Sequence, residues 1–144
     1  MKNIKYTKTS PLMGEKIPMP TYATDGSAGI DLRACIESPI LIQPNATEII
    51  DSGIAIAIDD PTIAAILLPR SGLGIKHGIV LANLVGLIDS DYRKEIKIAV
   101  WNRSNRPFTI NQGDRICQMV FVPIIQARLK FIEELNDNGR GGLS

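Results

Sequence analysis

Strict alternation marks the segment Glu95-Ile96-Lys97-Ile98-Ala99-Val100-Trp101. Because successive side chains of a β-strand point to opposite sides, one face of this segment carries Ile96, Ile98 and Val100. The pattern predicts a strand that buries one face and exposes the other. The segment Ile54-Ala55-Ile56-Ala57-Ile58 predicts a second strand, with isoleucines on one face and alanines on the other.

Short apolar runs bounded by turn formers recur along the rest of the chain. The further expected strands are Ile40–Ile42, Thr47–Ile50, Ile63–Leu68, Val80–Leu84, Thr109–Ile110 and Arg115–Val122. The 23 isoleucines, 12 glycines and 9 prolines favour many short strands joined by turns. We expect one short helix, Ser71–His77, with Ser71 as a candidate N-cap. The sequence therefore predicts an all-β sandwich or barrel.

The length of 144 residues fits one domain. We expect residues 1–134 to form a single β domain. Residues 135–144 are polar and glycine-rich, a composition typical of a mobile tail, and we expect them to form a flexible C-terminal arm. Cys35 and Cys117 are far apart in the sequence and predict neither a disulfide scaffold nor a zinc site.

The charge balance excludes some classes of partner. With 16 basic and 15 acidic residues, the net charge of +1 argues against a nucleic-acid binder and gives no reason to expect binding to a membrane. No apolar run approaches the ~20 residues of a membrane span. The first residues lack the apolar core of a signal peptide. We therefore expect a cytoplasmic protein.

The segment Pro69–Gly74 is a candidate anion site. It joins an expected strand to an expected helix, and the free N–H groups of a helix start favour anions. Arg70 would add a charge and Ser71 a hydroxyl. Taken alone, the segment fits an ordinary turn equally well. The only histidine, His77, lies near the expected helix end, where we expect a structural role.

The segment Gly86–Tyr92 is a candidate catalytic site. Asp89 follows a largely apolar stretch, and desolvation there would raise its pKa and make it a better base. Tyr92 could present a flat ring to a sugar or a base. A hairpin turn with solvated aspartates is the alternative interpretation.

Two amides complete the list of candidates. Asn83 could offer a donor and an acceptor to the edge of a pyrimidine, and Gln118 could reach a ligand from its strand. Either amide could instead be a satisfied structural residue. In the tail, Arg140 could fold over an anionic substrate as part of a lid, or it could belong to a disordered terminus.

Taken in order, these segments resemble the five motifs of the trimeric deoxyuridine triphosphate pyrophosphatases (dUTPases). The matching stretches are Ala28-Gly29-Ile30-Asp31-Leu32-Arg33-Ala34, Pro69-Arg70-Ser71-Gly72-Leu73-Gly74-Ile75-Lys76-His77-Gly78, Asn83-Leu84-Val85-Gly86-Leu87-Ile88-Asp89-Ser90-Asp91-Tyr92-Arg93, Asp114-Arg115-Ile116-Cys117-Gln118-Met119 and Gly139-Arg140-Gly141-Gly142. The resemblance spans almost the whole chain and implies a jelly-roll-like fold.

The resemblance implies an activity and a role for each site residue. The activity is hydrolysis of dUTP to dUMP and pyrophosphate, which keeps uracil out of DNA and supplies dUMP for thymidylate synthesis. Asp89 would be the general base, Asn83 the uracil reader and Tyr92 the platform beneath the deoxyribose. The remaining expected substrate contacts are Arg70, Ser71, Gly72, Gly86, Leu87, Ile88, Lys97, Gln118 and Arg140.

The resemblance also implies a metal and a partner. Asp31 would meet Mg²⁺ through water, with the ion held mainly by substrate phosphates. Since Mg²⁺ keeps several waters, it needs no dense carboxylate cage. The arm would cross to another subunit of a homotrimer, so that one site draws on several chains.

Two alternatives stay open at this stage. A dCTP deaminase or a bifunctional deaminase of the same fold would need a glutamate as a proton shuttle, and Glu95 is the available one, although charge alternation on a strand also explains it. A non-catalytic trimeric binding module is the alternative of another class, against which the intact Asp89–Tyr92 segment argues.

The last motif departs from the family pattern at one position. Members usually carry an aromatic residue after Arg-Gly-Gly, but Leu143 stands here and Ser144 follows it. A leucine cannot stack on uracil as a ring does. We therefore expect either a weakened arm or a truncated one, with the core chemistry intact.

Leu143→Phe should restore stacking on the base. Because aromatic contacts contribute about 0.5–1.5 kcal/mol, the expected gain in kcat/KM for dUTP is about threefold. Steady-state kinetics on the two proteins check it. Unchanged kcat and KM would show that closure of the arm does not limit the reaction.

Overall fold

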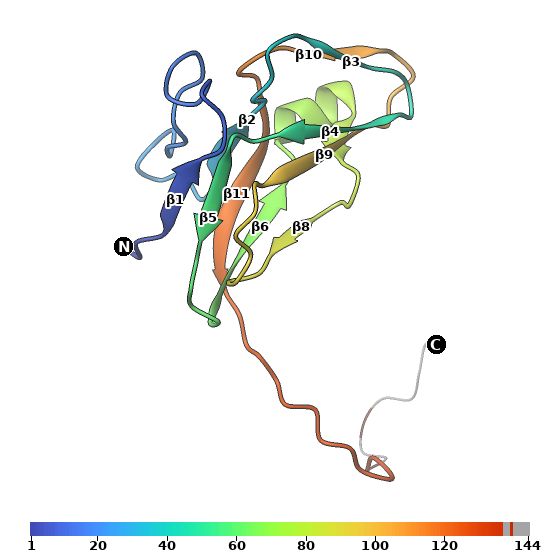
Figure 1. Cartoon of the computed structure of the whole chain (residues 1–144). Helices are drawn as coiled ribbons and strands as arrows, with labels where there is room; N and C mark the ends of the chain where they lie inside the picture. The colour runs from blue at the N-terminus through green and yellow to red at the C-terminus, as the bar shows by residue number, and fades with distance from the viewer. Residues whose placement is uncertain (137–138, 140–144) are drawn as a thin grey trace.

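The computed structural model describes residues 1–136 and 139 (Figure 1). Within them the chain forms eleven strands and one short helical segment. The strands are β1 Lys5–Lys8, β2 Ile30–Arg33, β3 Ile40–Ile42, β4 Thr47–Asp51, β5 Ile54–Ala57, β6 Ile63–Leu68, β7 Ile79–Leu81, β8 Gly86–Ile88, β9 Lys97–Asn102, β10 Phe108–Ile110 and β11 Arg115–Pro123. The helical segment is η1, Leu73–His77.

The strands pair antiparallel in every sheet. The largest sheet has the order β2-β11-β6-β8, and a second has the order β4-β9-β7. Two further pairs, β1 with β5 and β10 with β3, extend the layers. Figure 1 shows these strands wrapped around a common interior. The predicted all-β, jelly-roll-like architecture is confirmed.

The alternating strand behaves as predicted. In β9, Ile98, Val100 and Asn102 are buried, while the side chains between them are exposed or half-buried. Asn102 is a polar residue in the core, and both polar atoms of its side-chain amide make hydrogen bonds. Its Nδ2 donates to the carbonyl oxygens of Ile42 (2.9 Å) and Arg106 (2.7 Å), and its Oδ1 accepts from Ser104. This satisfies the buried amide.

The strand expected over Val80–Leu84 is shorter than predicted. It ends at Leu81, and residues 82–85 form a turn in which Leu84 has a φ of 64°. Positive φ is unfavourable for a branched side chain, so the backbone conformation of Leu84 must be held by the two sheets that the turn connects. The turn carries the chain from the sheet of β7 to the sheet of β8. Asn83 therefore lies in a corner between sheets and not on a strand.

The predicted helix Ser71–His77 is observed at the expected residues. Ser71 and Gly72 are α-helical, Leu73–His77 continue as a wide π-helical turn, and no side-chain hydrogen bond caps the start. Ser71 lies inside the first turn, so the N-cap role predicted for it is wrong. The segment ends at Gly78, whose φ of 68° favours glycine. The ring of His77 packs against Phe108, with centroids 5.2 Å apart.

The last strand leads into an extended segment. Residues 124–136 carry no strand or helix, and Figure 1 shows them leaving the body of the domain. Several apolar side chains on them are almost fully exposed, among them Ile125 (93%) and Leu129 (94%). Within the described residues, no helix has the length and apolar character needed to cross a membrane.

Candidate active site

One cluster of polar side chains forms at the carboxyl end of β6, where β2 and β11 run alongside. Asp31 of β2 lies between two arginines: its Oδ1 is 3.1 Å from Nε of Arg70, and its Oδ2 is 3.5 Å from Nη1 of Arg115. Arg70 also approaches the carbonyl oxygen of Arg115 at 3.5 Å. We call Gly29, Asp31, Arg70, Arg115 and Gln118 the arginine cluster.

Gln118 joins this cluster from β11. Its Nε2 donates to the carbonyl oxygen of Pro69 (3.0 Å), so the amide is held against the segment that carries Arg70 and Ser71. Gly29 leaves the space that this amide needs. A Cβ at Gly29 would lie 2.8 Å from Oε1 of Gln118, which is closer than real contacts allow. The β2–β11 pairing thereby fixes the Gln118 side chain.

The alternation predicted from Arg115 onward is interrupted. The register against β2 shifts between Arg115 and Cys117, and both Ile116 and Cys117 are buried. Gln118 consequently lies on a less buried face than Met119. Burial raises the pKa of the Cys117 thiol to about 12, so this cysteine stays protonated and unreactive.

Ser71 and Gly72 are exposed at the start of the helical segment, beside Arg70. A side chain at Gly72 would meet no atom within 4 Å, so the backbone there is open to an incoming group. The first N–H groups of a helix have no acceptor within it and are suited to anions. The predicted phosphate-contacting residues Arg70, Ser71, Gly72 and Gln118 are therefore brought together.

A second cluster forms a groove of about 240 Å³ beside β8. We call it the nucleoside groove. Its walls contain six of the predicted substrate-binding residues, together with Leu67 and Ile96. Those six are Asn83, Gly86, Leu87, Ile88, Tyr92 and Lys97. The groove is assembled from the corner before β8, from β8 itself and from the connection to β9.

Asp89 follows β8 directly and is exposed in the single chain. The prediction that the preceding apolar residues desolvate it is wrong. Those residues are Gly86 and Ile88, which are buried, and Leu87, which points outward, so they do not cover the carboxylate. Asp89 accepts a backbone hydrogen bond from Tyr92 N through its carbonyl (3.1 Å), which closes a tight turn.

Lys97 lies in the groove wall but is already paired. Its Nζ is 2.5 Å from Oδ1 of Asp51 and 2.9 Å from Oε1 of Glu95. The hydrogen bond to Asp51, followed by that to Glu95, raises the pKa of Lys97 above its usual value. Its charge is offset by two carboxylates, so Lys97 is less suited to binding phosphate than a free lysine would be.

Asp89 and Gln118 lie at different levels along β6. Gln118 pairs with Leu68, the last residue of the strand, while Ile88 pairs with Ala65. Asp89 follows Ile88 and is therefore level with Ala64, four residues from Leu68. At about 3.3 Å per residue, this separation along β6 is about 13 Å. Among the described residues, no hydrogen bond or ion pair connects the two clusters.

The described part of the chain contains no group of three or more His, Cys, Asp or Glu side chains that could hold a metal ion. Asp31 is a single carboxylate paired with two arginines, so it cannot form a direct metal cage by itself. Mg²⁺ bound to phosphates keeps several waters. The residues present thus fit an ion that arrives with a phosphorylated ligand.

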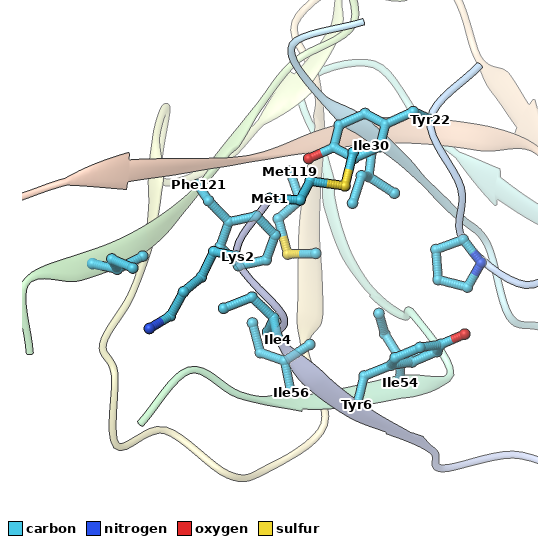
Figure 2. A pocket seen from close by; sticks show the side chains of 12 residues that line it. Met1, Lys2, Ile4, Tyr6, Tyr22, Ile30, Ile54, Ile56, Met119 and Phe121 are labelled. Carbon is cyan, nitrogen blue, oxygen red and sulfur yellow. The ribbon is translucent and has the colours of Figure 1, made fainter. Parts of the chain in front are cut away.

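A separate apolar cavity of about 300 Å³ lies between β1, β5 and β11 (Figure 2). Ile54 and Ile56 of β5, Tyr6 of β1, and Met119 and Phe121 of β11 point into it. None of the predicted site residues within the described part of the chain lines this cavity.

Sequence reasoning missed Arg115, although it stands three residues before Gln118 in the fourth motif. A second arginine next to a candidate phosphate ligand was the available signal. It also missed Asp51, which accepts a hydrogen bond from Lys97, and Thr9, which donates one to Glu95. Both partners lie far away in the sequence. Arg140 and Leu143 lie outside the described residues.

The architecture is that of a jelly roll. Solved dUTPases from staphylococcal phages share the fold. One from phage phi11 of S. aureus superposes with a TM-score of 0.79 at 22% identity, covering 94% of this chain and all of that one. One from Staphylococcus bacteriophage 80alpha with dUpNHpp gives a TM-score of 0.81 at 21% identity, covering 99% and 97%.

The sequence comparisons define the family. A family model described as dUTPase matches residues 15–143. A deoxyuridine 5'-triphosphate nucleotidohydrolase of Cronobacter sakazakii is 54% identical over 99% of this chain and 95% of its own length. Another, of Idiomarina loihiensis, is 57% identical over 90% of this chain and 85% of its own length. The chain belongs to the dUTPase family.

Gly29→Ala should displace the Gln118 amide, because the new Cβ has no room beside Oε1. Losing one hydrogen bond to a charged ligand should weaken the affinity for a nucleoside triphosphate about tenfold. Titration calorimetry measures it. Gly26→Ala is the matched control, since a Cβ there meets nothing within 4 Å. Equal affinities in both variants would contradict the assigned role of Gln118.

Proposed function

We infer that this chain hydrolyses dUTP to dUMP and pyrophosphate. The observation that carries the inference is the assembly of six predicted nucleoside contacts into one groove next to Asp89. The family membership of nearly the whole chain agrees with it. This activity would keep uracil out of DNA and provide dUMP for thymidylate synthesis.

Asp89 acts as the general base. Its carboxylate accepts a proton from a water molecule whose oxygen attacks the α-phosphorus. The bond from that phosphorus to the bridging oxygen of the β-phosphate breaks, and pyrophosphate leaves. Positioned acid–base catalysis of this kind contributes about 10²–10⁴-fold. The short turn closed by Tyr92 N fixes where the carboxylate stands.

The arginine cluster binds the triphosphate. Arg70 offers guanidinium donors, Ser71 and Gly72 offer the open backbone of the helix start, and Gln118 offers an amide that Pro69 orients. The ion pair with Asp31 orients Arg70 before the ligand arrives. Mg²⁺ bound to the phosphates would neutralise charge, and Asp31 is the residue that would contact its water shell.

The nucleoside groove recognises deoxyuridine. Asn83 offers a donor and an acceptor to the base, and the backbone of Gly86, Leu87 and Ile88 lies alongside. A strand packed against carbon 5 of the ring leaves no space for a methyl group, which excludes thymine. The ring of Tyr92 forms the wall that meets the deoxyribose and crowds a 2′-hydroxyl.

We propose that the working enzyme is a homotrimer with shared sites. Two observations support this. Asp89 and Gln118 of one chain are about 13 Å apart along β6, and no hydrogen bond or ion pair among the described residues joins their two clusters. The exposed apolar residues of the segment 124–136, such as Ile125 and Leu129, are also suited to burial against another chain.

The remaining expectations extend this proposal. Arg140 would hold the γ-phosphate when residues 135–144 close over the site as an arm. A cytoplasmic location is supported by the two buried free cysteines, Cys35 and Cys117. Nothing in the structure favours the deaminase, because the Glu95 carboxylate is already hydrogen-bonded by Gly53 N and Thr9 Oγ1.

Asp89→Asn should leave nucleotide binding in place and remove most turnover. The amide keeps the size of the side chain but cannot take the proton, so kcat for dUTP should fall about 10³-fold. Pyrophosphate release measures turnover, and calorimetry measures binding. Asp91→Asn, an exposed neighbour in the same turn, is the control. Turnover near the original rate in the Asp89 variant would exclude the proposed base.

A further inference from the structure

The Glu95 carboxylate joins three parts of the chain. Its Oε2 accepts from the backbone N–H of Gly53 (3.0 Å) and from Oγ1 of Thr9 (2.6 Å), and its Oε1 pairs with Nζ of Lys97 (2.9 Å). The side chain is only 18% exposed. One carboxylate therefore accepts from three donors, which belong to the segment after β1, the β4–β5 turn and β9. A glutamate that only alternates with apolar residues on a strand surface would not be expected to make all three contacts.

The Gly53 N–H is a fixed anchor. Gly53 has a φ of 77°, and a Cβ there would lie 2.6 Å from Sγ of buried Cys35. Only glycine fits this position, so the donor that meets Glu95 cannot easily move. The backbone continues the attachment, because Ile96 N donates to the carbonyl oxygen of Ile54 (2.9 Å).

The connection between β8 and β9, residues 89–96, is also attached at its first residues. Asp59 N donates to the carbonyl oxygen of Ser90 (3.0 Å), and the Asp59 carboxylate pairs with Arg93. Residues 89–96, which carry Asp89 and Tyr92, are thus attached to β5 and its flanks at both ends. Glu95 supplies the side-chain attachment nearest to the nucleoside groove.

Two walls of the groove depend on Glu95. The Tyr92 hydroxyl donates to the Glu95 carbonyl oxygen (3.2 Å), which ties the ring to the backbone of Glu95. Lys97 is held between Asp51 and the Glu95 carboxylate. Both Tyr92 and Lys97 line the groove, while Glu95 itself does not.

We propose that Glu95 is a positioning residue that holds Tyr92 and Lys97 at the spacing that admits deoxyribose and rejects ribose. The proposal rests on the proposed hydrolysis of dUTP. It also assigns Lys97 a structural place in the groove wall, as the cation between two carboxylates, and not a role as a phosphate ligand.

Glu95→Gln tests the proposal with almost no change in volume. An amide can accept from Gly53 N, but its NH₂ then faces the Lys97 ammonium, donor against donor. We expect KM for dUTP to rise about tenfold and the kcat/KM preference for dUTP over UTP to fall about tenfold, with kcat at saturating dUTP within about threefold. Glu48→Gln, an exposed glutamate on β4, is the matched control and should change none of these.

Thr9→Val is the second variant and leaves the carboxylate and its ion pair in place. Removing one of three donors should shift KM and selectivity in the same direction by about two- to threefold. If the Glu95→Gln protein does not fold, the Thr9→Val variant alone tests the positioning role of Glu95. A loss of kcat with unchanged KM and unchanged selectivity, or no change at all, would overturn the positioning role. Wild-type protein inactive on dUTP would instead contradict the proposed function itself.

Discussion

The pairing of β6 with β11 on one side and β8 on the other is the constraint on which the site depends. Leu68 opposite Gln118 fixes the arginine cluster at the carboxyl end of β6. Ala65 opposite Ile88 fixes Asp89 towards the amino end. A shift of either ladder by one residue would turn every side chain of the moved strand to the other face. The apolar sequence of β6, with Ala64, Ala65 and Leu67 buried, holds both registers.

In the proposed trimer, the arginine cluster beside Leu68 would bind the phosphates, and the segment after β8 would supply the base beside the nucleoside groove. Asp89, exposed in one chain, would then meet the arginine cluster of a second chain. The same assembly would bury the exposed apolar residues of 124–136.

Much of this could be predicted from the sequence. Period-two alternation identified β9, and apolar runs gave β3 and β6 with their observed bounds, because local pattern and burial agree there. The corner at Leu84 could not be predicted, since it is set by the two sheets that it connects. The groove residues grouped as the motifs implied. The contacts that hold the groove in place could not be predicted from the sequence. Glu95 meets Thr9 and Gly53 only through long-range contacts, which no local sequence pattern records.

The central claim is that the carboxylate and the arginine cluster of one working site come from different chains. Subunit exchange between Asp89→Asn and Arg70→Ala proteins, each lacking a charged group of the site, tests it most directly. If sites are shared, random mixing gives about one site in four both native residues, so about a quarter of the wild-type dUTP turnover should return. Activity no higher than the sum of the two separate variants, with exchange verified by mass, would contradict the account.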